Sequence, residues 1–331
     1  MGAELVYACA RVRSNEKFML GKDKLNNMAE SKTIEDVCKV LQDAGYGEEG
    51  ETVSPVYYEQ SLVKETQKLY RFLYSIAPGQ PEFNVFAYPF DYHNIKALLK
   101  SEALGTNAQD ILMQGGTIEP QAMAADVKER NFMKMTVHMK HGIEEAVDMH
   151  ARTHDPQCID LILDKHCYAD LTEVADRSGN LFLKGYVRLL IDTINLKTFV
   201  RVRQMGQPWS YFSSVYISGG NIDEKTFVGG YDEPLNQFAQ RLSSYALGDA
   251  AEHGCAGIKE TGKFTEIEKL CDNALIRYVQ EAKAHTFGIE PLVAYAVAKQ
   301  IEIKCVRIIL AGKTVGIEPS SIRERLRETY E

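Results

Sequence analysis

The sequence has 331 residues, of which 45% are apolar and 25% charged, and its net charge is −8. These values are typical of a folded protein that buries a substantial core in two or three domains. The acidic balance argues against a broad nucleic-acid surface. The seven cysteines are odd in number and form no Cys-x-x-Cys pair. We therefore expect a protein of the reducing cytosol rather than one held by a disulfide framework.

Helical periodicity dominates the chain, and strand patterns are scarce. In chain order the pattern predicts helices over residues 34–44, 91–104, 158–176, 192–205, 266–283 and 300–311. Stretches with several glycines and prolines separate them at residues 45–55, 77–81, 229–234 and 248–262. The longest apolar run, residues 292–298, is far shorter than the about 20 residues that span a bilayer. An all-α fold without a transmembrane span is therefore predicted.

One helical pattern occurs twice, 101 residues apart, with a looser third copy. The first copy contains Asp91, Asn94, Lys96 and Gly105, and the second contains Asp192, Asn195, Lys197 and Gly206. The third copy runs from Gln300 to Gly312. Each glycine is expected to end its helix in the left-handed conformation. A repeat of this length predicts three similar helical domains, at residues 1–125, 126–228 and 229–331. Such domains are expected to have a structural rather than a catalytic role.

Two glycine motifs resemble nucleotide-binding sequences but lack their context. Residues 45–50 fit Gly-x-Gly-x-x-Gly, yet they follow a predicted helix instead of a strand and include two glutamates that would repel a pyrophosphate. Residues 312–314, Gly-Lys-Thr, resemble the end of a P-loop, but Arg307 stands where the motif needs its first glycine. We expect neither motif to bind a phosphate. We therefore predict no cofactor and no cofactor-binding residue.

A group of histidines lies between residues 138 and 166. The group consists of His138, His141, His150, His154 and His166. His150 and His154 are spaced to share a helix face, but Ala151 replaces the glutamate of the His-Glu-x-x-His zinc motif. Surface or capping histidines are the favoured interpretation, and a metalloenzyme is the alternative. We therefore predict no metal ligand and no catalytic residue.

Both ends of the chain and one central element carry a family resemblance. Residues 7–13 (Tyr-Ala-Cys-Ala-Arg-Val-Arg), residues 88–96 with their Asp-Tyr-His-Asn-Ile-Lys core, and residues 302–313 and 322–327 resemble the C subunit of bacterial and archaeal V-type (A-type) ATPases. Residues 34–47 are similar to the first helix pair of that family. The likeness covers essentially the whole length of the chain.

The resemblance implies a funnel-shaped, all-helical protein of three similar domains around a pseudo-threefold axis. Such a protein is non-catalytic and joins the central shaft, formed by the D and F subunits, to the membrane rotor ring. It transmits torque on the cytoplasmic face of the membrane and is homologous to the d subunit of the eukaryotic enzyme. Lys96, Lys197 and Arg201 are candidate partner contacts, with a solvated helix surface as the alternative. A generic helical-repeat adaptor, without a role in a rotary motor, is the other hypothesis.

Overall fold

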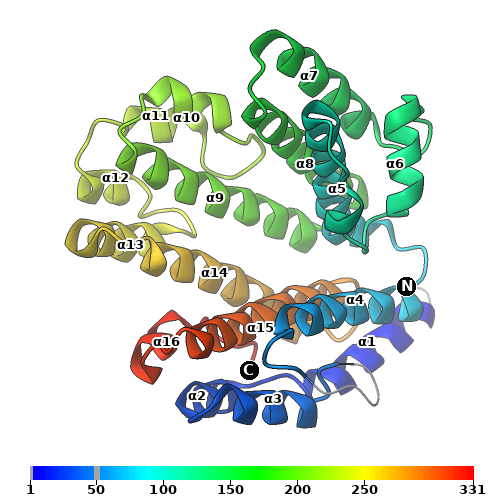
Figure 1. The fold of residues 1–331 in the computed structure, drawn as a ribbon. Helices are drawn as coiled ribbons and strands as arrows, with labels where there is room; N and C mark the ends of the chain where they lie inside the picture. Colours follow the sequence, from blue (N-terminus) through cyan, green and yellow to red (C-terminus); the bar gives the residue numbers. More distant parts are fainter. Residues whose placement is uncertain (1–2, 48–52) are drawn as a thin grey trace. The chain divides into compact units, whose positions relative to one another are not determined.

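The computed structural model describes residues 3–47 and 53–331, and within them it contains α-helices and short 3-10 helices but no strand (Figure 1). The all-helical prediction is confirmed. Contacts divide the chain into two compact units. Unit 1 combines Met1–Gln80 with Leu242–Glu331, and unit 2 is Pro81–Arg241.

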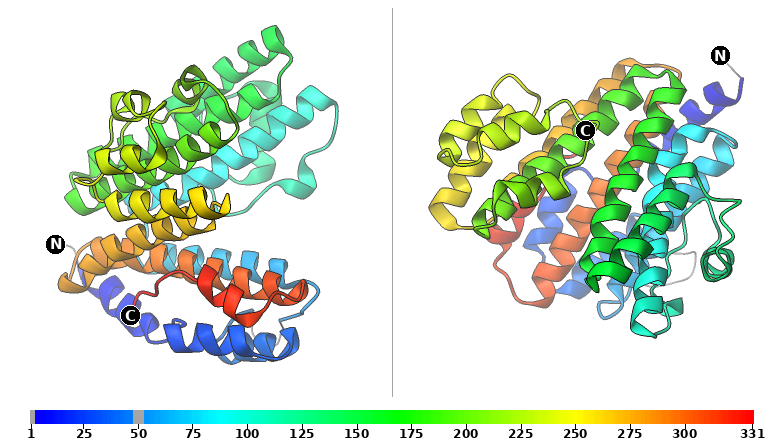
Figure 2. Two further views of the ribbon diagram at one scale, coloured as in Figure 1. Left: turned by 90° about the vertical axis from the view of Figure 1, so that its left-hand side faces the viewer. Right: turned by 90° about the horizontal axis from the view of Figure 1, so that it is seen from above.

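Unit 1 is built from both ends of the chain. Its helices are α1 (Ala3–Glu16), α2 (Lys22–Glu30), α3 (Ile34–Asp43), α4 (Tyr58–Ile76), α13 (Gly248–Thr261), α14 (Thr265–Gln280), η3 (Glu281–Ala284), α15 (Glu290–Thr314) and α16 (Pro319–Arg325). The centre is α15, which packs against α1, α2, α3, α4, α14 and α16. Figure 2 shows the blue N-terminal helices beside the orange and red C-terminal ones in both views. Most of α15 is buried because helices surround it, and it is accordingly apolar on nearly all sides.

Unit 2 is continuous in sequence. Its helices are η1 (Pro81–Phe83), α5 (Asn84–Leu104), η2 (Gln109–Ile111), α6 (Pro120–Glu129), α7 (Val137–Thr153), α8 (Gln157–Ser178), α9 (Leu181–Gln204), α10 (Trp209–Val215), α11 (Glu224–Gly229) and α12 (Leu235–Arg241). The long helix α8 packs against α5, α7 and α9. Phenylalanine rings from α9, α10, α11 and α12 form a separate aromatic cluster.

Three of the long helices, α5, α9 and α15, end in the same way. Gly105, Gly206 and Gly316 follow α5, α9 and α15 with φ of 64°, 66° and 69°. In each case the next residue donates its N–H to a carbonyl five residues back, which satisfies an otherwise unpaired carbonyl of the last turn. The predicted caps at Gly105 and Gly206 are confirmed. The predicted cap at Gly312 is wrong, because Gly312 lies inside α15 against Ile322 and the helix continues to Thr314.

The division into domains at residues 125 and 228 stays a prediction. Residue 125 lies within α6 and residue 228 within α11. What recurs along the chain is a long helix that ends at a left-handed glycine, followed by a loop and a short helix. The side chains that hold each of these loops lie on the long helices.

Candidate functional site

Two buried polar side chains on α5 hold the loop that follows this helix. Asp91 and Asn94 are completely buried. The carboxylate of Asp91 accepts backbone N–H bonds from Thr117 (2.8 Å) and Ile118 (3.2 Å). The amide of Asn94 exchanges two bonds of 2.7 and 2.8 Å with the backbone of Met113. We call Asp91 and Asn94 a loop-binding pair, because they supply partners to backbone groups of a loop that runs against the helix.

The second copy of the repeat forms the same bonds. Asp192 accepts N–H bonds from Asn221 (3.1 Å) and Ile222 (3.0 Å). Asn195 exchanges bonds of 2.7 and 3.0 Å with the backbone of Ile217. Burial raises the pKa of Asp91 and of Asp192, and the hydrogen bonds that their carboxylates accept oppose this rise. The spacing found in the sequence thus corresponds to a repeated hydrogen-bonding device.

A glycine lies directly against each of these carboxylates. A Cβ atom at Gly116 would be 2.1 Å from Oδ1 of Asp91, and one at Gly220 would be 2.2 Å from Oδ1 of Asp192. Both glycines have ordinary negative-φ backbone, so the close approach of the carboxylate, and not the conformation of the chain, requires them. The Gly-Gly element of the sequence is therefore part of each loop-binding site.

Replacing Gly220 with alanine is expected to destabilise unit 2 by about 1–3 kcal/mol, because the added methyl group overpacks the site and displaces the Asp192 carboxylate. The measurement is urea denaturation followed by circular dichroism. Gly229→Ala is the matched control, since its Cβ would meet only the Arg241 side chain at 3.9 Å. Equal stability of the two variants would show that the carboxylate contact does not constrain the loop.

A third loop-binding pair appears when residues are counted back from Gly316. Glu302 and Cys305 then occupy the places of Asp192 and Asn195. Glu302 accepts an N–H bond of 2.6 Å from Leu20, and the Cys305 sulfur accepts one of 3.4 Å from Arg327. The predicted third copy is therefore present, but its register differs from the one inferred from the sequence.

The N-terminal segment completes this third copy. Leu20 is a buried residue placed two positions before α2, just as Ile118 and Ile222 precede α6 and α11 by two positions. All three donate their N–H to the carboxylate of a long helix. This partner of Glu302 was not predicted, because a single leucine before a short helix carries no recognisable signal.

Glu302 also belongs to a buried group of charges in unit 1. Lys299 is 3.1 Å from Glu65 and 2.6 Å from Glu302, with side chains that are 9%, 6% and 3% exposed. The hydroxyl of Tyr46 donates to Glu302 at 2.6 Å. Burial lowers the pKa of Lys299, but the two carboxylates outweigh burial, and the pKa lies above its ordinary value. This group links α15 to α4 and to the end of α3.

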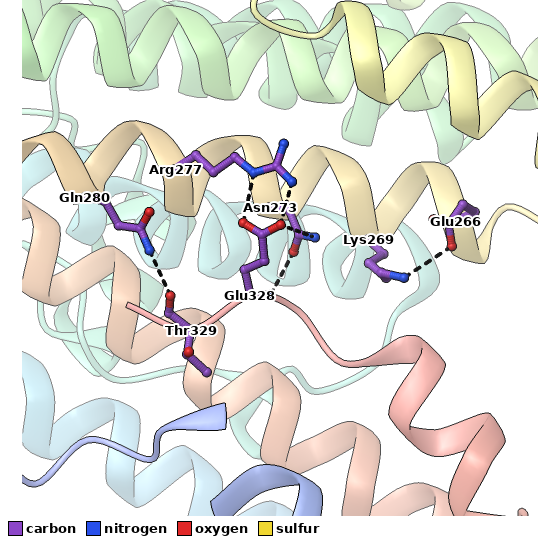
Figure 3. A network of polar contacts seen from close by, with 7 residues as sticks. All are labelled: Glu266, Lys269, Asn273, Arg277, Gln280, Glu328 and Thr329. Atoms are coloured by element: carbon purple, nitrogen blue, oxygen red, sulfur yellow. Dashed lines mark hydrogen bonds and ion pairs between the residues drawn. The ribbon is translucent and has the colours of Figure 1, made fainter. Parts of the chain in front are cut away.

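The C-terminal segment lies along α14 and is held by polar contacts (Figure 3). Glu328 accepts bonds from Arg277 (2.5 and 2.9 Å) and from Asn273, and the Thr329 carbonyl accepts one of 3.0 Å from Gln280. Next to them, Arg327 forms a buried ion pair of 2.9 Å with Asp272, which is also on α14. These contacts fix the segment that supplies the backbone N–H to Cys305.

The candidate partner contacts have different environments. Lys96 forms an ion pair of 2.5 Å with Asp164 on α8, and its side chain is only 21% exposed. Lys197 is half-buried, and Arg201 is exposed. Lys96 connects α5 to α8, whereas Lys197 and Arg201 stay candidate partner contacts, with a solvated helix surface as the alternative.

Within the described residues, the two glycine motifs lie at the ends of α15 and α3. Lys313 donates to the Ser31 carbonyl at 2.6 Å, and Thr314 donates to the Leu310 carbonyl at 2.9 Å. Both side chains are thus engaged within unit 1, at the end of α15. Of residues 45–50, residues 48–50 lie outside the described part of the chain. Gly45 and Gly47 have φ of 80° and 92°, which is turn conformation after α3.

The histidines of residues 138–166 do not converge on a single point. His154 ends α7 in the left-handed conformation with φ of 54°, as a capping residue. Its ring centroid is 6.4 Å from that of His150. His166 contacts Glu145 at 3.1 Å. Among them, His138 alone belongs to a group whose ligand atoms lie close together in the described part of the structure, with Asp170 and Glu173.

The repeated device extends over nearly the whole chain, and so does the similarity to known proteins. The family model of the ATP synthase (C/AC39) subunit matches residues 8–325. The chain belongs to this family.

Individual members of the ATP synthase (C/AC39) subunit family align over similar lengths. The C subunit of the V-type sodium ATPase of Enterococcus hirae is 23% identical, over 97% of each chain. The C subunit of the A-type ATP synthase of Methanocaldococcus jannaschii is 25% identical, over 98% of this chain and 86% of its own. That of Thermococcus kodakarensis is 25% identical, over 97% and 90%.

Membership in the ATP synthase (C/AC39) subunit family places the chain in a V-type or A-type ATPase, a complex of ATP synthesis and ion transport. No helix among residues 3–47 and 53–331 has both the length and the apolar character of a membrane span. The resemblance stated from the sequence is confirmed.

Proposed function

We propose that the chain is a non-catalytic coupling component of the central stalk of a rotary V/A-type ATPase. It joins the shaft, formed by the D and F subunits, to the membrane rotor ring and transmits torque for ATP synthesis or ion transport. It acts peripherally, on the cytoplasmic face of the membrane. The family match over residues 8–325 is the main support for this proposal, because it covers nearly the whole chain.

The contacts within each unit suit a torque-transmitting part. Such a part has to keep its shape under load, which requires fixed loops and cross-linked helices more than a reactive group. The first two loop-binding pairs hold the loops after α5 and α9 by hydrogen bonds, and the third holds the backbone at Leu20 and Arg327. The ion pair of Lys96 with Asp164 and the charge group of Lys299 connect neighbouring helices. We further propose that the three copies are related by a pseudo-threefold axis and form a funnel.

Co-purification tests the coupling role. We expect a mixture of the chain, the D–F shaft and the detergent-solubilised rotor ring to elute as one complex, and the shaft and the ring alone to elute separately. The purified chain by itself is expected to hydrolyse no ATP above background. If the chain bridges neither component, the coupling role is wrong. Binding to other proteins but to neither of these would favour a generic helical-repeat adaptor.

A further inference from the structure

We propose that His138, Asp170 and Glu173 form a binding site for a divalent transition-metal ion of the zinc type. The three ligand atoms lie within 4.8 Å of one another. They come from two helices: His138 is in the first turn of α7, and the two carboxylates are on α8. Asp170 and Glu173 are three residues apart, so they share a face of α8.

The distance between His138 and Glu173 suits a small ion. A tetrahedral zinc ion with ligands at about 2.0–2.2 Å places its donor atoms about 3.4 Å from one another. Nε2 of His138 is 3.4 Å from Oε2 of Glu173. That separation exceeds the usual N–H···O hydrogen-bond range of about 2.7–3.2 Å. The spacing of the imidazole and the carboxylate is thus compatible with two ligands of one ion.

Hydrogen bonds hold the carboxylate of Asp170 in place without a bound ion. Asp170 is 2% exposed, and its Oδ2 accepts two hydroxyl bonds of 2.6 Å, from Tyr92 on α5 and Thr136 at the start of α7. Hydroxyl groups that orient a ligating carboxylate from behind are a regular feature of metal sites. They reduce the conformational freedom that the carboxylate would lose on binding an ion.

Charge and access also fit a cation. The two carboxylates of the group attract a cation, although Arg177 already offsets part of the charge of Glu173. Arg177 pairs with Oε1 of Glu173 and thereby leaves Oε2 beside His138. The side chains of His138 and Glu173 are 32% and 35% exposed, so an ion can enter from solvent while Asp170 forms the buried end. The bound ion would tie the start of α7 to the middle of α8.

This site differs from the one that the sequence suggested. The prediction of no metal ligand rests on His150 and His154, whose four-residue spacing resembles part of a zinc motif. His138 and the carboxylates of α8 are more than thirty residues apart in the sequence, and only the packing of α7 on α8 brings them together. For His138 the proposal therefore replaces that prediction.

Metal titration of the full chain tests the proposal. After chelator treatment and dialysis, Zn²⁺ is titrated by calorimetry and Co²⁺ by its visible absorption. We expect one ion per chain, a higher thermal midpoint with Zn²⁺, and affinity at least about 10-fold weaker in both His138→Ala and Glu173→Gln. These side chains are part-exposed and both variants should fold, which circular dichroism verifies.

The double variant His150→Ala, His154→Ala is the matched control and should bind as the unaltered chain does. The proposal is overturned if the unaltered chain binds no ion. It is equally overturned if His138→Ala and Glu173→Gln bind with unchanged affinity, or if only the double variant loses binding. The result does not depend on assembly with D, F or the ring, so it is independent of the proposed coupling role.

Discussion

Replacing Lys299 with methionine is expected to destabilise unit 1 by about 3–5 kcal/mol, the cost of removing one partner from a buried ion pair. The methionine has nearly the same volume, so the loss is electrostatic and not a cavity. Without the ammonium group, Glu65 and Glu302 become two buried carboxylates with no cation between them. At least one of them must then take up a proton or draw water into the core, and both outcomes cost free energy.

Urea denaturation at neutral pH measures this effect. Lys39→Met is the matched control, because Lys39 is 76% exposed and its pairing with Asp36 at 3.8 Å contributes little. Adding Glu65→Gln to Lys299→Met should restore part of the stability, since it removes one of the two buried carboxylate charges. A Lys299→Met protein as stable as the control would refute the importance of the buried group.

The pH dependence has a defined sign. Because the pKa of Lys299 is raised in the folded chain, its contribution is complete below the ordinary lysine value of about 10.4. The contribution is lost as pH rises through the folded-state pKa. In urea denaturation of the unaltered chain, the contribution of Lys299 should therefore stay constant near neutral pH and decrease only in strong alkali.

Replacing Phe199 with alanine is expected to destabilise unit 2 by about 3–5 kcal/mol. Phe199 is completely buried and stacks on Phe238 with ring centroids 4.1 Å apart. Its ring also contacts Phe212, Phe227 and Tyr231 at centroid distances of 5.2, 5.4 and 5.5 Å. The truncation leaves a cavity in the middle of this cluster and removes the contact that these rings share.

Hydrogen exchange should localise the damage. Helices α10, α11 and α12 have seven, six and seven residues, too few to be stable without tertiary packing. Their amide protons should exchange much faster in Phe199→Ala, whereas those of α5 and α8 should change less. Leu181→Ala is the control on the same helix, as Leu181 is 83% exposed. Uniform loss of protection in unit 2 would contradict a local role of the cluster.

The repeat shows how far the sequence could predict the candidate site. The positions of Asp91 and Asp192 are recognisable because the same residue types recur at the same spacing before a glycine. The third copy is predicted in the wrong register, because glutamate and cysteine replace aspartate and asparagine there. A hydrogen bond at such a position requires an acceptor at the right distance from the backbone, and more than one residue type can supply it. A sequence pattern can therefore miss a hydrogen bond that the structure contains.

The basic side chains of the long helices illustrate a second limit. Lys96 and Arg201 both lie on helix positions that periodicity assigns to the polar face. Periodicity cannot distinguish a charge that faces solvent from one that meets an opposite charge on a neighbouring helix, because both sit beside the apolar stripe. Only the packing of α5 on α8 places Asp164 next to Lys96.

By itself, the sequence determined the all-helical class, the repeat and the family, since each depends on local spacing or on ordered motifs along the chain. Tertiary structure decided which residues meet. Leu20 donates to Glu302 and Tyr46 contacts the same carboxylate, although more than 250 residues separate each pair. In the third copy of the repeat, the Glu302 carboxylate on a C-terminal helix thus accepts hydrogen bonds from N-terminal residues. Contacts of this kind follow from the burial of α15 among helices from both ends, which no local pattern records.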